Sequence, residues 1–238
     1  MKTIIHKSDS RGKADHGWLK SNHSFSFASY HNPERMGFGL LRVLNDDVVE
    51  PSRGFGTHPH ENMEIVSIPL SGSLRHKDSE GNKTVIKSGE VQIMSAGTGV
   101  LHSEFNDSGQ DPVNFLQIWV MPEKLNIAPR YDQREFPESG RQNQFQVVVS
   151  PLDTSDQGIK INQQAYFSLA SLGAGNSLTY HIHNLNHGAY VFVFEGSVDV
   201  FGETLQTRDA IGIQDASAIE LIAASDTNLL VIEVPMNQ

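Results

Sequence analysis

Short apolar segments of β-type composition recur along almost the whole chain, and this pattern limits its possible folds more than any other feature. Residues 64–70 (EIVSIPL) and 113–121 (VNFLQIWVM) are typical, because they are rich in Val, Ile, Leu and Phe and are bounded by Gly, Asn, Asp or Ser. The first 120 residues contain no long apolar stripe with the 3.6-residue period of a helix. The sequence therefore predicts an all-β protein built from sandwiches or barrels.

The two halves of the chain resemble each other weakly. In the first half the sequence HPH (58–60) is followed by a predicted strand and then by SGS (71–73). In the second half HIH (181–183) is followed by a predicted strand and then by EGS (195–197). Between the halves, residues 122–144 are polar, contain three prolines and are predicted to be a linker. We therefore expect two copies of one β fold in tandem.

Composition excludes several classes of function. The chain has no cysteine, which rules out disulfide frameworks, zinc fingers, iron–sulfur clusters and cysteine nucleophiles. Its net charge is −10 and its basic residues are scattered, so we expect no nucleic-acid partner. Residues 1–12 do not resemble a signal peptide, and no apolar run is long enough to span a bilayer. A cytoplasmic protein without a membrane segment is expected.

Two pairs of side chains predict a mononuclear metal site in the first half. His58 and His60 are two residues apart, as are His102 and Glu104, and alternate residues of a strand point to the same face. The second pair follows a glycine-rich turn at residues 97–99. Two such pairs on neighbouring strands could supply three imidazole nitrogens and one carboxylate oxygen. This ligand set suits divalent transition metals and resembles that of non-haem iron oxygenases.

The same segments resemble the metal site of the pirin family, which belongs to the cupin superfamily. Residues 56–65 (GTHPHENMEI) and 94–106 (MSAGTGVLHSEFN) are similar to the two halves of that site. Within the family, the chain most resembles the bacterial pirin-like quercetin 2,3-dioxygenases. The resemblance is strong over the first 136 residues and extends to the rest in outline. Flanking stretches agree at residues 16–30, 41–47, 76–82, 116–122 and 129–136.

This resemblance implies a bicupin, in which two jelly-roll β-barrel domains follow each other. Residues 1–136 would form the metal-binding cupin domain, and residues 137–238 a degenerate cupin domain. The resemblance also implies one divalent metal ion in the first domain, held by four ligands. We expect iron(II) first, with Zn, Ni, Mn, Cu or Co as alternatives. The ligands carried over from the family are His58, His60, His102 and Glu104.

Glu64 is a second candidate for the carboxylate ligand. It follows His60 by four residues, as does the glutamate of the general cupin pattern HxH(x)3E, and it shares the face of His60 if the strand is regular. The pirin pattern uses the glutamate of HxE instead, which favours Glu104. Glu64 would then lie behind the ligands and orient a histidine, or line the pocket.

Other residues are predicted to lie near the metal or to be structural. Gln117 could line the substrate pocket from its strand, and His23 and Phe25 could form an aromatic part of the wall. His181 and His183 are expected to be a vestigial or structural pair, because residues 216–221 offer no matching histidine. His76 is expected at the surface of a hairpin.

The resemblance implies a ring-cleaving dioxygenase whose substrates are a flavonol, such as quercetin, and O2. The metal would lower the pKa of the flavonol 3-hydroxyl group, and Glu104 would accept its proton as the catalytic base. Reaction with dioxygen would open the central ring and release carbon monoxide. Two alternatives remain open. The chain could be a metal-binding regulatory protein with a protein partner, or a metal-dependent isomerase or hydrolase, because cupins host unrelated chemistries.

Overall fold

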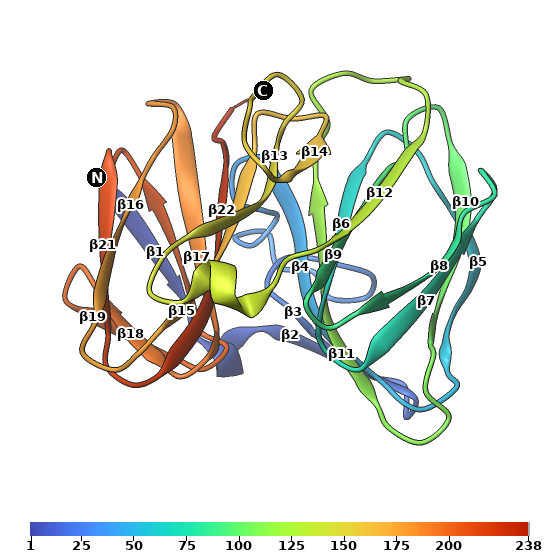
Figure 1. Cartoon of the computed structure of the whole chain (residues 1–238), viewed down its shortest axis with the longest axis horizontal. Coiled ribbons are helices and arrows are strands. Elements are labelled where there is room, and N and C mark those ends of the chain that lie inside the picture. Colours follow the sequence, from blue (N-terminus) through green and yellow to red (C-terminus); the bar gives the residue numbers. More distant parts are fainter. Residues whose placement is uncertain (238) are drawn as a thin grey trace.

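The computed structural model describes residues 1–237, and within them the protein is almost entirely β-structure (Figure 1). The first half contains β1 (Lys2–His6), η1 (Ser8–Ser10), β2 (Gly12–Asp15), β3 (Leu19–His23), β4 (Leu41–Val49), β5 (Gly54–His60), β6 (Glu64–Ser71), β7 (Ser73–Asp78), β8 (Lys83–Lys87), β9 (Glu90–Ser95), β10 (Val100–Asn106), β11 (Val113–Val120) and β12 (Arg130–Glu135). The second half contains η2 (Glu138–Arg141), β13 (Gln146–Pro151), β14 (Ile159–Ile161), β15 (Tyr166–Leu172), β16 (Ser177–His181), β17 (His187–Glu195), β18 (Ser197–Val200), β19 (Glu203–Gln206), β20 (Ala210–Gln214), β21 (Ala218–Ala223) and β22 (Thr227–Pro235).

The chain forms two barrel-like lobes, and each lobe consists of one seven-stranded sheet and one four-stranded sheet (Figure 1). The seven-stranded sheets have the orders β12-β9-β6-β11-β4-β3-β2 and β1-β20-β17-β22-β15-β13-β14. The four-stranded sheets have the orders β5-β10-β7-β8 and β16-β21-β18-β19. Strands that correspond in the two halves hold the same places in these orders. The predicted all-β fold with two tandem copies of a cupin domain is therefore confirmed.

The first strand of the chain completes the sheet of the second lobe. β1 pairs antiparallel with β20, at the sheet edge where the first lobe has β12 paired with β9. Residues 2–6, which the sequence analysis placed in the first domain, thus lie in the second sheet. The prediction of a linker over residues 122–144 is wrong for residues 130–135, because these form β12. Their polar side chains suit an edge strand, where a row of backbone groups remains open to solvent.

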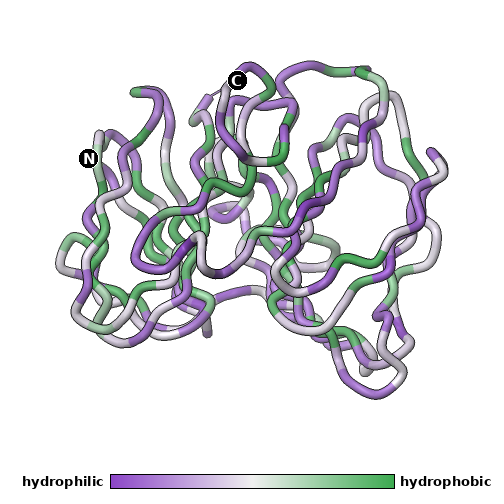
Figure 2. Tube along the Cα trace, viewed as in Figure 1, coloured by the Kyte–Doolittle hydropathy of each residue, from purple (hydrophilic) through white to green (hydrophobic). Residues whose placement is uncertain are grey.

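The interiors of the two lobes differ in how completely apolar side chains fill them. The largest buried cluster contains side chains from both seven-stranded sheets and joins the lobes through β4, β6, β9 and β11 on one side and β15, β17 and β22 on the other. A second large cluster fills the interior of the C-terminal lobe. Among residues 1–237, the clusters in the interior of the N-terminal lobe are two and both are small. Hydrophobic stretches follow the strands in both lobes, and hydrophilic residues dominate the connecting loops (Figure 2).

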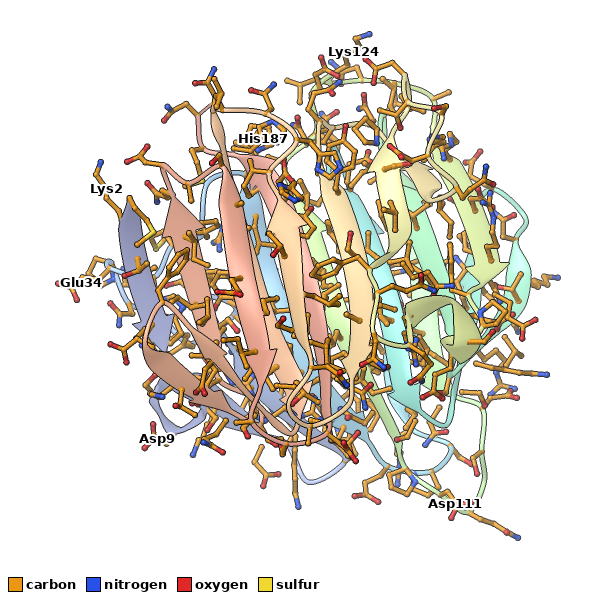
Figure 3. All side chains as sticks on the ribbon, turned by 60° about the vertical axis from the view of Figure 1, so that its left-hand side comes forward. Lys2, Asp9, Glu34, Asp111, Lys124 and His187 are labelled. Atoms are coloured by element: carbon orange, nitrogen blue, oxygen red, sulfur yellow. The ribbon has the colours of Figure 1, made fainter. Side chains whose placement is uncertain are left out.

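The N-terminal lobe is therefore the one with room for a ligand in its interior. Its loops before and after β11 lie at opposite ends of the lobe, as Asp111 and Lys124 show (Figure 3). Among residues 1–237, no helix is long and apolar enough to cross a membrane.

Candidate metal centre

β5 and β10 bring the predicted histidines together. The two strands pair antiparallel, with His102 opposite His58 and Val100 opposite His60. The turn before β10 needs glycine, since Gly97 has a φ of 49° and a Cβ there would lie 2.1 Å from the carbonyl oxygen of Ile127. This turn fixes where β10 begins, and so which of its residues face the barrel interior.

Three imidazole rings meet inside the barrel. The ring centroids of His58 and His102 are 4.4 Å apart, and His60 lies 4.9 Å from His58 and 4.8 Å from His102. The Nε2 atoms of His58 and His102 are 2.9 Å apart. The Nδ1 atom of His58 lies 2.8 Å from the carbonyl oxygen of Gly56, so this nitrogen carries the proton and leaves a lone pair on Nε2. The three rings thus converge so that their nitrogen lone pairs could bind one metal ion.

Burial keeps the rings of His60 and His102 neutral at physiological pH. It lowers the pKa of His60 to about 4, with a further contribution from the neighbouring His58. Burial, followed by the repulsion from His58, His60 and His76, also lowers the pKa of His102 far below its usual value. Neutral imidazoles are the form that binds a metal ion, and a cluster of neutral nitrogen donors with one carboxylate suits divalent transition metals. The residues present therefore fit such an ion.

Glu104 lies beside this cluster and is buried. Its Oε2 accepts a hydrogen bond of 2.8 Å from the Gln117 side-chain amide, and its Oε1 is 3.3 Å from the hydroxyl of Ser67. The strand register changes between His102 and Glu104, so that Glu104 pairs with Phe55 of β5. Burial raises the pKa of Glu104 to about 7. A carboxylate with such a pKa is a suitable proton acceptor near neutral pH.

A fourth histidine, predicted at the surface, forms a second group of ligand atoms with His102 and Glu104. That prediction is wrong, because His76 is 0% exposed, and its ligand atoms lie within 4.8 Å of those of His102 and Glu104. Its Nε2 is 3.0 Å from Asp78 Oδ2, while its buried Nδ1 has no partner among the described residues. A hairpin position gave no reason to expect burial. The sequence signal that could have predicted its burial is that His76 shares a strand face with the apolar Leu74, two residues before it on β7.

A cavity of about 480 Å³ opens beside the cluster within the N-terminal lobe. Of the predicted wall residues, Gln117 and His23 line it, and His58, His60 and Glu104 reach it. Phe25 does not lie on the wall. It packs in the core between the lobes, 5.4 Å from the ring of Tyr190. The remaining lining is mostly aromatic, apolar or small polar: Ala14, His16, Trp18, Leu19, Ser21, Phe27, Ala28, Ser29, Asn45, Asp47, Phe55 and Trp119.

Glu64 lies apart from the cluster and from this cavity. It is 1% exposed, and its Oε2 accepts hydrogen bonds of 2.7 Å from Ser95 Oγ and 3.1 Å from the backbone N–H of Asn162. The Asn162 bond links the two halves of the chain. Glu64 therefore supports the contact between the lobes, and it orients neither of the candidate histidines next to it in sequence.

The second HxH pair has a different environment. His183 Nδ1 lies 2.7 Å from Glu233 Oε2, and its ring stacks on Tyr166 with centroids 3.7 Å apart. His187, at one end of the C-terminal lobe, contacts the other oxygen of Glu233 at 2.8 Å (Figure 3). His181 is exposed. Within residues 1–237, groups of three or more His, Asp or Glu side chains with converging ligand atoms occur only in the N-terminal lobe.

The fold and the site together define a two-barrel cupin protein with a histidine-rich candidate metal centre in its first barrel. Comparison with known families agrees with this description. The pirin model matches residues 5–120, and the model of the quercetinase C-terminal cupin domain matches residues 147–234. The chain belongs to the pirin family.

Relatives of known name and structure support this membership. A quercetin 2,3-dioxygenase of Escherichia coli K12 is 43% identical over 232 residues, which cover 97% of this chain and 98% of the relative. A pirin-like protein of Caulobacter vibrioides is 38% identical over 225 residues, covering 94% and 96%. The crystal structure of the bacterial pirin YhhW of Escherichia coli in complex with nickel(II) superposes with a TM-score of 0.92 at 42% identity, covering 98% and 99% of the two chains.

Proposed function

We propose that this protein is a metal-dependent flavonol 2,3-dioxygenase that opens the central ring of quercetin-type substrates and releases carbon monoxide. The observation that carries the proposal is the convergence of His58, His60 and His102, next to the buried Glu104, at an aromatic cavity of about 480 Å³. Such a cavity has the size and apolar lining of a site for a small planar ligand. The names of the relatives support the same reaction.

In this proposal His58, His60, His102 and Glu104 hold one divalent ion. We expect iron(II), with Zn, Ni, Mn, Cu and Co as the alternatives that reconstitution has to compare. The crystal structure of a bacterial pirin in complex with nickel(II) supports a divalent transition metal as the cofactor. When bound, the ion lowers the pKa of the flavonol 3-hydroxyl group and brings dioxygen close to the substrate.

The chain itself supplies a base and a cavity with a mostly apolar and aromatic lining. Glu104 accepts the proton of the 3-hydroxyl group, and Gln117 holds the carboxylate in place through the bond to Oε2. Trp119 and Phe27 pack edge to face, with ring centroids 5.3 Å apart, and exclude water from the substrate rings. Electrons from the deprotonated flavonol then reduce dioxygen, whose two atoms enter the ring-opened product as carbon monoxide leaves.

The test is reconstitution of metal-free protein with each candidate metal, followed by flavonol-dependent oxygen uptake and carbon monoxide release. Turnover that needs no oxygen would indicate an isomerase or hydrolase. Metal binding without turnover of any flavonol would favour the regulatory alternative.

Two glutamine variants test which carboxylate is the catalytic base. Glu104→Gln should lose most turnover, because an amide cannot accept the substrate proton. Glu64→Gln should retain metal and appreciable turnover, since Glu64 contacts Ser95 and Asn162 rather than the cavity. The reverse result would assign the base to Glu64.

A further inference from the structure

One wall of the cavity carries polar side chains in register across three neighbouring strands. Gln117 of β11 pairs with Asn45 of β4, and Asn45 pairs with His23 of β3. All three line the cavity. Because neighbouring strands lie about 4.8 Å apart, Asn45 is roughly 5 Å and His23 roughly 10 Å from Gln117 across the sheet. Gln117 itself binds Glu104, so the row leads away from the candidate metal centre.

The two outer members of this row are buried and incompletely hydrogen-bonded. Asn45 and His23 are each 2% exposed. Among residues 1–237, the Oδ1 atom of Asn45 and the Nδ1 atom of His23 have no hydrogen-bond partner. A buried polar atom without a partner costs about 1–3 kcal/mol, and most native proteins avoid this cost. Because both residues line the cavity, we expect a ligand whose polar groups form the missing hydrogen bonds.

A carboxyl group extends the row along β4. Asp47 lies two residues after Asn45, on the same face of the strand, and also lines the cavity. It is 4% exposed, and its Oδ1 accepts a hydrogen bond from the hydroxyl of Ser21 on β3. Burial raises the pKa of Asp47 to about 7, so near neutral pH this group can either donate a hydrogen bond to a phenol or accept one from it.

We propose that Asn45, His23 and Asp47 bind hydroxyl groups on the phenyl substituent of the flavonol, so that the site selects substrates that are hydroxylated on this ring. The phenyl substituent is attached to the carbon next to the one that bears the 3-hydroxyl group. With the 3-hydroxyl at Glu104, the hydroxyl groups of the phenyl ring lie one ring further along the polar row. This inference rests on the proposed function, because the flavonol supplies both groups.

Two substrates that differ only on this ring provide the test. Quercetin carries two hydroxyl groups on its phenyl substituent, and 3,5,7-trihydroxyflavone carries none. We compare kcat/KM for the two substrates in metal-loaded wild type and in Asn45→Leu. Asn45→Ser is a second variant, which keeps the test valid if Asn45→Leu does not fold. Leu44→Ala is the matched control, because Leu44 is buried in the core on the other face of the same strand.

Wild type should prefer quercetin, and the ratio of the two kcat/KM values should fall roughly tenfold in the Asn45 variants, as expected for the loss of one hydrogen bond. Leu44→Ala should lower the thermal stability and keep the ratio. An equal preference in wild type, or a ratio that the Asn45 variants retain, would overturn the inference. A ratio that falls as far in Leu44→Ala would also overturn it, since the effect would then be structural.

Calorimetric Kd values for the same two compounds, measured without oxygen, separate this inference from the proposed function. If wild type binds quercetin more tightly and Asn45→Leu loses this difference while no protein shows turnover, the proposed dioxygenase function fails and the recognition of the phenyl hydroxyl groups stands. If turnover occurs and both compounds bind equally well, the dioxygenase function stands and the inference fails.

Discussion

Replacing Glu64 by glutamine should stabilise the metal-free protein relative to wild type as the pH rises. Glu64 is buried between the lobes, and its Oε1 atom has no hydrogen-bond partner among the described residues. Burial outweighs the bonds from Ser95 and Asn162 and raises the pKa of Glu64 from 4.5 to about 7. The folded protein therefore favours the protonated form, whereas the unfolded chain ionises at the ordinary pKa.

The sign and size of the effect follow from this difference. Below the unfolded pKa the carboxyl group is protonated in both states, and its contribution to stability is fully present. As the pH rises toward the folded pKa of about 7, the unfolded chain loses its proton first, and wild type loses stability. Integrated from pH 5 to pH 8, the loss is roughly 2.5 kcal/mol. Glutamine cannot ionise, so the variant avoids this loss.

Urea denaturation of chelator-treated protein at pH 5 and pH 8 measures the effect. The stability of Glu64→Gln minus that of wild type should be roughly 2.5 kcal/mol more favourable at pH 8 than at pH 5. The buried Glu104 and Asp47 also titrate in this range, but both proteins contain them and their contributions cancel. Glu123→Gln, at an exposed site, is the control. A stability difference that is the same at both pH values, or equally large in the control, would show that the ionisation of Glu64 does not destabilise the folded protein.

Four further outcomes are expected. Glu104→Gln should lower flavonol-dependent oxygen uptake by roughly 10²- to 10⁴-fold, the usual contribution of a general base, and retention of full activity would exclude this role. His102→Ala should release the metal and keep the circular dichroism of a folded β protein, whereas full metal occupancy would remove His102 from the ligand set. The double variant His181→Ala/His183→Ala should still bind one ion per chain by elemental analysis, and a stoichiometry that falls from two to one would reveal a second site. Deleting residues 2–6 should expose the edge of β20 and lower the Tm by about 3 °C or more in calorimetry, while an unchanged Tm would show that β1 adds no stability.

Local sequence patterns were sufficient to predict the class of fold and the pairs of candidate ligands. Apolar runs of strand length and turn residues require β-structure, and the HxH and HxE spacings place each pair on one face of a strand, because side chains alternate with a period of two. The similar halves predicted two domains, which the matching sheet orders confirm. These properties depend on residues close together in the chain, so that local geometry is sufficient to deduce them.

Which strands meet, and which face of a strand is enclosed, could be learned from the folded chain alone. The alternation along β4 shows that Asn45 and Asp47 share a face, but the cavity on that face exists because the four-stranded sheet covers it. His76 joins the second group of ligand atoms through the pairing of β7 with β10, and Glu64 faces the other lobe, although its spacing from His60 suggested a ligand. β1 crosses to the second sheet over more than 200 residues of sequence. Pairings between such distant segments depend on the packing of the whole chain, and the period of a single strand carries no information about them.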